Sequence, residues 1–503
     1  MPSTVVSDTQ RTYTESEACI GVIVLLTLLG LVLRLTFFNG PVGSDDTRYY
    51  LSAQMIVHGG HISVLDHATS RLALLLLVGA PAALAGSIFV AGVVNVIVSV
   101  VTQVVASVFA FRQIGPRAGV VVAVVLAFDG LAITYSGMLM PDNPLALFTL
   151  LCGILLYHAD GAAMRSALVS FLLAGVAAGA AYSTKDTGIL LLVPAVLWAL
   201  WQRDRPLRDR LALCVAFTAG FIPVWVMEGL FFLARAGDFL YKPHALATAH
   251  NAGVKPSHGL IEFARRGWWN VAEVHRSVWL TAVPLVVGFI CWVRLLLPRR
   301  RTAVFALIGG FVTAYLFVGT SSFSRLVNLP YQERYFIPVI PCVAIALADV
   351  LERWRGGPRA SWLTALAVAC FVGGVVGTAA RSGRLYFTEG IRNAAIAVNA
   401  LPDDGRPVLA TSQIRWGVTQ YLTPQAALRV HDATDYPKGT PGYYLTVLRN
   451  GAPAIADSTA PNTLGAAYLS VAVDQRRKRL WSIDGARARD SAVVYLMERD
   501  SGR

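Results

Sequence analysis

Long uncharged stretches separated by short polar loops dominate the first three quarters of the chain. A helix needs roughly 20 consecutive apolar residues to cross a bilayer, and several of these stretches approach that length. The stretch 72–88 is ambiguous, because it is apolar but contains Gly79 and Pro81. The remaining stretches predict eleven spanning helices, at 19–38, 89–111, 118–135, 144–158, 167–182, 188–201, 211–233, 278–297, 302–319, 335–351 and 361–380.

The pattern changes after about residue 380, where apolar runs become short and polar residues frequent. There the periodicity predicts strands at 407–410, 427–431 and 492–499 and a helix at 412–422. We therefore expect a polytopic α-helical membrane domain over 1–380, with outer loops at 39–88 and 234–277. A small soluble α/β domain is expected over 381–503.

Composition agrees with a membrane protein. Of the 503 residues, 55% are hydrophobic and only 15% are charged, whereas soluble domains have roughly 25% charged residues. The net charge is +13, but the basic residues gather between apolar stretches and form no stripe interleaved with aromatic residues. That distribution favours the membrane as a partner and argues against nucleic acid.

Arginine placement predicts the orientation. Cytoplasmic loops carry an excess of basic residues, and one set of alternating loops holds Arg112, Arg117, Arg165, Arg203, Arg205, Arg208, Arg210, Arg294, Arg299, Arg300, Arg301, Arg353, Arg355 and Arg359. The other short loops hold only Lys185, Arg325 and Arg334. With the first set inside and no net crossing in 39–88, the N-terminus is inside and the C-terminus outside. We expect a multi-pass protein of the plasma (inner) membrane.

An acidic pair, Asp45 and Asp46, follows the first predicted span. Carboxylates are costly near lipid, so their position indicates chemistry at the membrane–water boundary. We expect a helix to begin at the pair, with one of the two capping backbone N–H groups; a cap and a solvated loop is the plainer alternative. One side of that helix would carry Tyr49, Ala53 and Ile56, and another Arg48 and Ser52.

The expected topology brings several charged residues to the outer face from separate loops. They are Asp45, Asp46, Asp142, Lys185, Arg325 and Arg334. Carboxylates and cations that converge from independent loops are typical of a site for a charged substrate.

Four stretches give the chain a family resemblance: Asp45-Asp46-Thr47-Arg48-Tyr49, Leu139-Met140-Pro141-Asp142-Asn143-Pro144-Leu145-Ala146, Ser183-Thr184-Lys185-Asp186-Thr187-Gly188 and Tyr331-Gln332-Glu333-Arg334-Tyr335-Phe336-Ile337-Pro338. With these four stretches in this order, the sequence resembles the GT-C glycosyltransferases over roughly residues 20–350. It is most similar to protein O-mannosyltransferases and to the aminoarabinose transferases that modify lipid A.

The resemblance implies transfer of a sugar, with inversion, from a polyprenyl-phosphate carrier to a lipid, glycan or protein acceptor on the outer face. The first motif is Asp-Asp where protein mannosyltransferases have Asp-Glu, and the long soluble insert of the eukaryotic enzymes is absent. Both departures weaken the case for a protein acceptor.

Chemistry explains why such residues are needed. A carboxylate within hydrogen-bond reach can take the proton of an attacking acceptor hydroxyl. A departing lipid phosphate remains anionic and needs cations, for which the arginine fork is well suited.

By analogy with the family, Asp45 is the base, with Asp46 as the competing candidate, and Asp142 orients the acceptor or the donor sugar. Lys185 and Arg334 bind phosphate. Further candidates for substrate or phosphate binding are Arg48, Tyr49, Arg325 and Tyr331. Each main residue also has a structural alternative: a turn for Asp142, a snorkelling side chain for Lys185 and an interfacial anchor for Arg334.

The roles of two further sets of residues stay open. Arg34, Asp129 and Glu228 lie within apolar stretches, where a charge usually faces a cavity or a partner. No cofactor is identified, but a divalent metal remains a hypothesis, because histidines and carboxylates gather in one outer loop. They are His244, His250, His258, His275, Glu262 and Glu273.

A transporter or lipid flippase is the alternative from another functional class. Transporters usually show paired halves and helices broken near mid-membrane. Here the charges concentrate at one face and no half-repeat is visible, which favours the enzyme. A membrane scaffold that presents the C-terminal domain is a third possibility, but it leaves the acidic pair unexplained.

Overall fold

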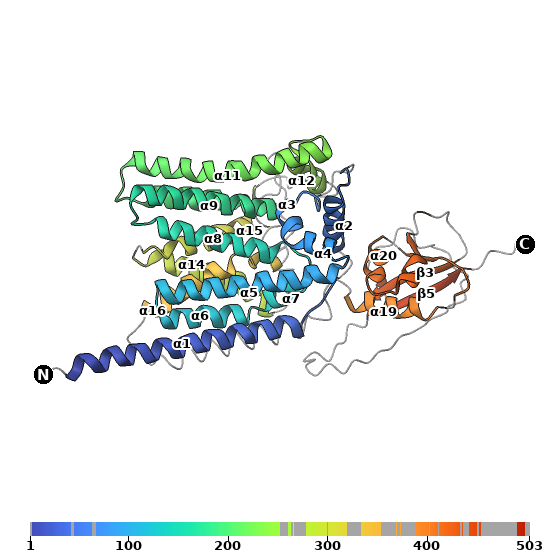
Figure 1. Ribbon diagram of the computed structural model, residues 1–503, viewed down its shortest axis with the longest axis horizontal. Coiled ribbons are helices and arrows are strands. Elements are labelled where there is room, and N and C mark those ends of the chain that lie inside the picture. The colour runs from blue at the N-terminus through green and yellow to red at the C-terminus, as the bar shows by residue number, and fades with distance from the viewer. Residues whose placement is uncertain are drawn as a thin grey trace, which may run out of the picture.

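Long helices lie side by side, with a small unit of helices and strands beyond one end of the bundle (Figure 1). This computed structural model describes residues 3–41, 45–62, 67–251, 260–262, 265, 278–298, 300–318, 333–353, 369, 373, 388–401, 403–410, 412–432, 435, 442–449, 452–453 and 490–497.

The bundle consists of α1 (Ser3–Thr36), α5 (Ile88–Gln113), α6 (Pro116–Ala127), α7 (Gly130–Ser136), α8 (Asp142–Ala159), α9 (Met164–Thr184), α10 (Leu192–Trp201), α11 (Leu207–Ala236), α14 (Val278–Leu296), α15 (Ala303–Val318) and α16 (Ile340–Arg353). Among the described residues, five helices are long and apolar enough to cross a membrane, or six if α6 and α7 form one bent span. The chain is a polytopic helical membrane protein. Eleven spans stay a prediction, and 361–380 lies almost wholly outside the described residues.

Several predicted spans are interrupted for local reasons. The predicted helix 118–135 breaks before α7, where the Asp129 side chain accepts a hydrogen bond from the Leu131 N–H and caps the new helix. The predicted helix 335–351 instead starts with the short turn η3 (Glu333–Phe336). Pro338 disfavours the helical conformation of the preceding residue, and α16 begins only at Ile340.

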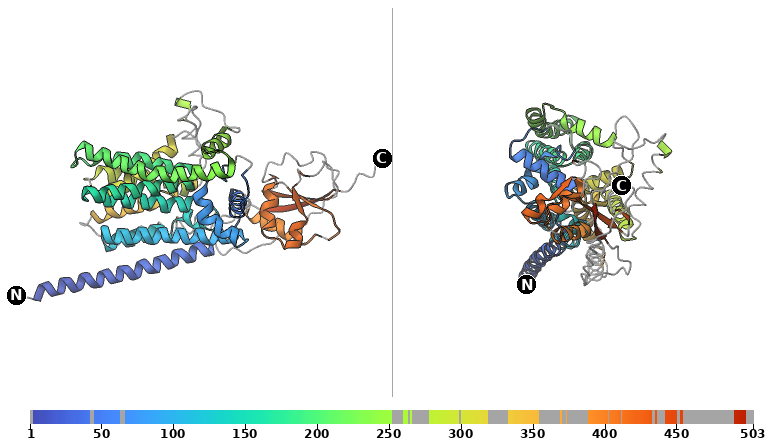
Figure 2. Two further views of the ribbon diagram at one scale, coloured as in Figure 1. Left: turned by 45° about the horizontal axis from the view of Figure 1, so that its top comes forward. Right: turned by 90° about the vertical axis from the view of Figure 1, so that its right-hand side faces the viewer.

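The ambiguous stretch 72–88 does not form another long helix. It contains three short pieces, α3 (Leu72–Leu74), η1 (Leu75–Gly79) and α4 (Ala80–Leu84), at the end of the bundle that also holds α2 (Asp45–Val57) (Figure 1). α2 runs across this end, between the bundle and the C-terminal strands (Figure 2).

α2 starts at the acidic pair, as predicted, and Tyr49, Ala53 and Ile56 are buried while Arg48 is exposed. Arg48 and Ser52 are four residues apart in this helix and therefore lie along another side, as expected, but they differ in burial. Ser52 is buried, and its hydroxyl lies 2.9 Å from that of Thr69, because the turn at 67–70 covers this second side of the helix.

α9 and α11 pack closely because glycines face the neighbouring backbone. A Cβ added at Gly175 would lie 1.9 Å from the Phe217 carbonyl oxygen, and one at Gly220 would lie 1.9 Å from that of Leu172. Small residues permit such an approach of membrane helices. The contact fixes α9 and α11 relative to each other; Lys185 of the site described below directly follows α9, and Glu228 lies on α11.

The C-terminal unit, by which we mean the described residues 388–497, contains α19 (Thr388–Asn399), β1 (Val408–Ala410), α20 (Ser412–Thr419), α21 (Pro424–Leu428), β2 (Val430–Asp432), β3 (Gly442–Arg449), β4 (Ala452–Pro453) and β5 (Asp490–Met497). The strand order is β2-β1-β3-β4, with β5 beside β3. β1 is parallel to β2 and β3, whereas β5 is antiparallel to β3.

The predicted strand 427–431 is wrong in its first half. Residues up to Leu428 belong to α21, because Thr423 caps that helix and Pro424 fits its first turn. The boundary at 381 and an independent soluble domain stay predictions.

One side chain of the C-terminal unit contacts the chain just before α2. The Tyr421 hydroxyl donates a hydrogen bond to the Pro41 carbonyl oxygen at 2.8 Å, and its ring meets Phe89 edge-on at 5.6 Å between centroids. The C-terminal unit therefore contacts the segment that leads into Asp45.

Candidate functional site

The end of the bundle that holds α2 collects charged side chains from separate elements. Asp45 begins α2, and Asp142 begins α8, where a carboxylate complements the helix dipole. Lys185 follows α9 in an extended conformation (φ −156°, ψ 140°), so the chain leaves the helix there. Arg334 belongs to η3.

These four residues, Asp45, Asp142, Lys185 and Arg334, form the ion-pair cluster. Lys185 Nζ lies 2.7 Å from Asp142 Oδ1. The Arg334 guanidinium lies between both carboxylates, 3.3 Å from Asp45 Oδ2 and 3.7 Å from Asp142 Oδ2. Asp142 is fully buried, whereas the Asp45 side chain is 30% exposed. The only partly open carboxylate of the cluster is thus that of Asp45.

Asp45 is held in its charged form. Burial alone would raise the pKa of this carboxyl, but attraction to Arg334, Arg71 and His67, together with the Arg334 hydrogen bond, outweighs burial and lowers the pKa below its usual value. At neutral pH the side chain is a carboxylate, the form that can accept a proton.

Lys185 experiences the opposite balance. Burial, and repulsion from Arg334 and Arg71, outweigh the attraction of Asp142 and lower the pKa of the Lys185 ammonium to about 8. Its Nζ also lies 3.9 Å from the centre of the Tyr335 ring. The lysine is therefore a cation at neutral pH that a modest rise in pH neutralises.

Arg71 is a further buried cation that the sequence reasoning missed. Its guanidinium donates to the Tyr49 hydroxyl and lies 5.1 Å from the centre of that ring. Its Nε, however, has no hydrogen-bond partner among the described residues. The available signal was a lone arginine at the border of the ambiguous stretch 72–88, on the same expected face as Asp45.

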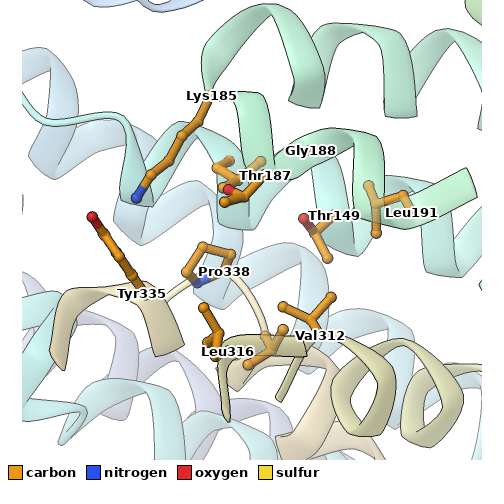
Figure 3. Close-up of a pocket in the computed structure, with 11 residues that line it drawn as sticks. Thr149, Lys185, Thr187, Gly188, Leu191, Val312, Leu316, Tyr335 and Pro338 are labelled. Carbon is orange, nitrogen blue, oxygen red and sulfur yellow. The ribbon is translucent and has the colours of Figure 1, made fainter. Parts of the chain in front are cut away.

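A small, mostly apolar pocket lies beside the cluster, between α8, η2 (Asp186–Leu191), α15 and the segment after η3. Lys185 and Tyr335 lie at one end, and Leu191 lies at the other (Figure 3). A cation at the mouth of an apolar pocket suits a ligand with an anionic head and an apolar tail.

The remaining predicted site residues are placed differently. Asp46 is completely buried, and Arg48 is exposed on α2. Arg325 and Tyr331 lie outside the described residues. Tyr49 accepts a hydrogen bond from the Arg71 guanidinium.

The charged residues within apolar stretches have partners of their own. Arg34 donates to Ser99 Oγ at 2.9 Å, to the Gly30 oxygen and to the Leu126 oxygen, and Asp129 attracts it. Glu228 pairs with Lys242 at 3.4 Å.

The metal hypothesis stays open. In the described part of the chain no three or more His, Cys, Asp or Glu side chains could hold a metal together, but His258, His275 and Glu273 and the side chain of His250 lie outside it. His244 is paired with Asp238, 2.7 Å away.

Comparison with known proteins relates this geometry to a family. Residues 85–236 match the dolichyl-phosphate-mannose-protein mannosyltransferase family. The fold matches ArnT from Cupriavidus metallidurans in the apo state with a TM-score of 0.58 and 17% identity, over 95% of this chain and 98% of that one. Over residues 85–236 the chain is therefore similar to this mannosyltransferase family, and over nearly its whole length it is similar in fold to ArnT.

A second ArnT structure shows the same fold. ArnT bound to undecaprenyl phosphate matches with a TM-score of 0.56 and 16% identity, over 94% of this chain and 98% of that one. The archaeal oligosaccharyltransferase AglB from Archaeoglobus fulgidus, in complex with an inhibitory peptide and a dolichol-phosphate, scores 0.45 at 13% identity, over 85% and 69%. No curated protein sequence matches significantly.

Proposed function

We propose that this protein is a GT-C glycosyltransferase that moves a sugar from a polyprenyl-phosphate carrier to an acceptor hydroxyl, with inversion, on the extracytoplasmic face of the plasma membrane. The observation that carries the proposal is Arg334, which joins the partly exposed carboxylate of Asp45 to the buried Asp142–Lys185 pair. A base open to an acceptor thus lies next to cations that suit a phosphate.

The donor phosphate would bind Lys185, Arg334 and Arg71. Three buried cations can stabilise the charge that grows on a departing phosphate, and the Arg71 Nε has an unused hydrogen bond to offer. The first isoprenoid units would enter the apolar pocket that starts at Lys185 (Figure 3). The undecaprenyl phosphate bound by ArnT, which shares the fold, supports this class of donor.

The reaction balances without a cofactor. The acceptor oxygen attacks the anomeric carbon and forms the new C–O bond, while the bond between that carbon and the phosphate oxygen breaks. The electron pair leaves on the phosphate, and the acceptor proton passes to Asp45. A single displacement inverts the anomeric carbon. Asp142 Oδ2, which accepts no hydrogen bond among the described residues, is available to a sugar hydroxyl.

Donor binding would also activate the base. In the free protein Arg334 holds Asp45 in an ion pair, which lowers its pKa and weakens it as a base. A phosphate that binds Arg334 competes for this guanidinium, so the pKa of Asp45 rises when the donor is present. The carboxylate is then a better proton acceptor when a sugar is ready for transfer.

The proposed orientation in the membrane rests on the distribution of arginine residues among the loops. The arginine-rich loops that join α5 to α6, α8 to α9 and α10 to α11 lie at the end of the bundle away from α2 (Figure 1). If these loops are cytoplasmic, the ion-pair cluster faces the outside.

Reconstitution tests the proposal. Purified protein in liposomes would be given radiolabelled polyprenyl-phosphate hexoses and pentoses with a membrane extract as acceptor. We expect label in a new product of inverted anomeric configuration, together with free polyprenyl phosphate. Label that crosses the bilayer on an unchanged carrier would instead indicate a flippase, and would overturn the proposal.

A further inference from the structure

A second buried polar cluster lies next to the site. It consists of Ser183, Glu228 and Lys242, whose exposed fractions are only 4%, 4% and 3%. The Ser183 hydroxyl donates to Glu228 Oε1 at 2.9 Å, and Lys242 Nζ lies 3.4 Å from the same oxygen. Burying two charges is costly unless they are well paired, so the arrangement needs a reason beyond packing.

The Ser183 hydroxyl connects two elements that are far apart in sequence. It accepts a hydrogen bond from the Ala73 N–H at 3.1 Å. This N–H lies in the first turn of α3, where backbone donors have no partner within the helix, and no side chain of its own segment caps α3. Because the single hydroxyl proton points to Glu228, a lone pair remains for Ala73. Glu228 thus orients the hydroxyl, and Lys242 compensates the charge of Glu228.

The two ends of this bridge carry phosphate-binding candidates. Ala73 lies two residues after Arg71, and Ser183 lies two residues before Lys185. Arg71 and Arg334 both repel Lys185. Without an anion between them, like charges favour a wider separation of their segments, and a connection between α3 and the end of α9 opposes it.

We propose that Ser183, oriented by the Glu228–Lys242 pair, is a positioning residue that sets the spacing between Arg71 and Lys185 and thereby the affinity for the donor phosphate. Neither Glu228 nor Ser183 touches the substrate in this account. The inference rests on the proposed function, since it assigns a device to the same phosphate site.

Substitution at Ser183 tests the bridge without leaving an unpaired buried charge. Ser183→Ala should raise the Kd for undecaprenyl phosphate about tenfold, equivalent to about 1.4 kcal/mol. Ser183→Thr, which keeps the hydroxyl, should retain most of the affinity. Because the bridge does not act on Asp45, the acid limb of the kcat profile should not move in Ser183→Ala.

Thr184→Val is the matched control. Thr184 is the next residue and is also buried, but within the described part of the chain its hydroxyl bonds only inside α9, to the Ala180 oxygen at 2.8 Å. We expect its Kd to equal that of wild type.

The outcomes separate the two proposals. An unchanged Kd in Ser183→Ala, or an equal loss in Thr184→Val, would overturn the positioning role while leaving the proposed function intact. A wild-type protein that does not bind undecaprenyl phosphate would overturn the proposed function and this inference with it.

Discussion

Arg334 is shared between Asp45 and Asp142, and this sharing gives the proposed mechanism a pH signature. Its guanidinium lowers the pKa of Asp45 in the free protein. If a bound donor phosphate draws Arg334 away, the pKa of Asp45 is higher in the complex. Activity depends on the Asp45 carboxylate. It is therefore lost as pH falls through the Asp45 pKa of the free protein or through that of the donor complex.

We therefore expect the acid limb of kcat, which reports on the complex, at higher pH than the acid limb of kcat/KM, which reports on the free enzyme. Steady-state profiles that extend from about pH 2.5 upward would show this difference, because they cover the range in which Asp side chains titrate. Arg334→Gln should bring the two limbs together, because the free enzyme then lacks the ion pair. Coincident limbs in the wild type would contradict the exchange of Arg334.

We expect Lys185 to make donor binding depend on pH in the alkaline range. Its pKa is lowered to about 8 by burial and nearby cations, so the free site loses a positive charge as pH rises through this value. A bound phosphate raises the pKa again. The Kd for undecaprenyl phosphate should then increase by up to about tenfold per pH unit above that point.

Lys185→Arg is the comparison, because arginine stays charged throughout the accessible range. Isothermal titration in nanodiscs at a series of pH values should give a rising Kd for wild type and a flat one for the variant. Equal slopes would show that another group titrates.

At the scale of elements, the α9–α11 contact supports both the ion-pair cluster and the Ser183 bridge. Gly175→Ala should lower the thermal midpoint, because the added Cβ meets the Phe217 oxygen. Overpacking of this kind costs about 1–3 kcal/mol.

Gly288→Ala in α14 is the control, since no atom of the described residues lies within 4 Å of its Cβ position. Thermal unfolding of both variants in one detergent would separate steric clash from the general effect of replacing a helical glycine. A Gly175→Ala protein as stable as Gly288→Ala would contradict the close packing.

Elements with a strong pattern could be predicted from sequence, and those that depend on contacts could not. The helix at Asp45 and the order of the long apolar helices follow from capping residues and apolar stretches. The burial of Ser52 and the role of Arg71 depend on how the segment 67–84 folds against α2 and α9, which no local periodicity encodes. α21 is not predicted by the alternation that favours a strand at 427–431, because its start depends on the Thr423–Pro424 cap, which lies outside that stretch.

The same limit applied to the site. Asp45, Asp142, Lys185 and Arg334 could be grouped from the order of loops alone, because charges at one face of a membrane protein are few. Their distances, and the bridge from Ala73 to Ser183, required the packed structure.

At the scale of the whole molecule, Tyr421 joins the C-terminal unit to the segment before Asp45. Tyr421→Phe removes the hydrogen bond to the Pro41 oxygen but keeps the ring against Phe89. Loss of about 1 kcal/mol should raise amide hydrogen exchange at 38–40 about fivefold.

Tyr443→Phe is a suitable control for that experiment. Its hydroxyl bonds Asp404 Oδ2 at 2.7 Å, within the C-terminal unit, so exchange at 38–40 should not change. Equal exchange in both variants would show that Tyr421 does not connect the two parts.

The central claim is that Asp45 takes the acceptor proton while neighbouring cations hold the donor phosphate. Single-turnover transfer from a labelled polyprenyl-phosphate sugar, measured with Asp45→Asn beside Asp238→Asn, tests it most directly. We predict that Asp45→Asn binds the donor at least as tightly as wild type but transfers about 10²–10⁴ times more slowly, and that Asp238→Asn, which alters a carboxylate paired with His244, behaves as wild type. Transfer by Asp45→Asn at a rate near that of wild type would contradict the account.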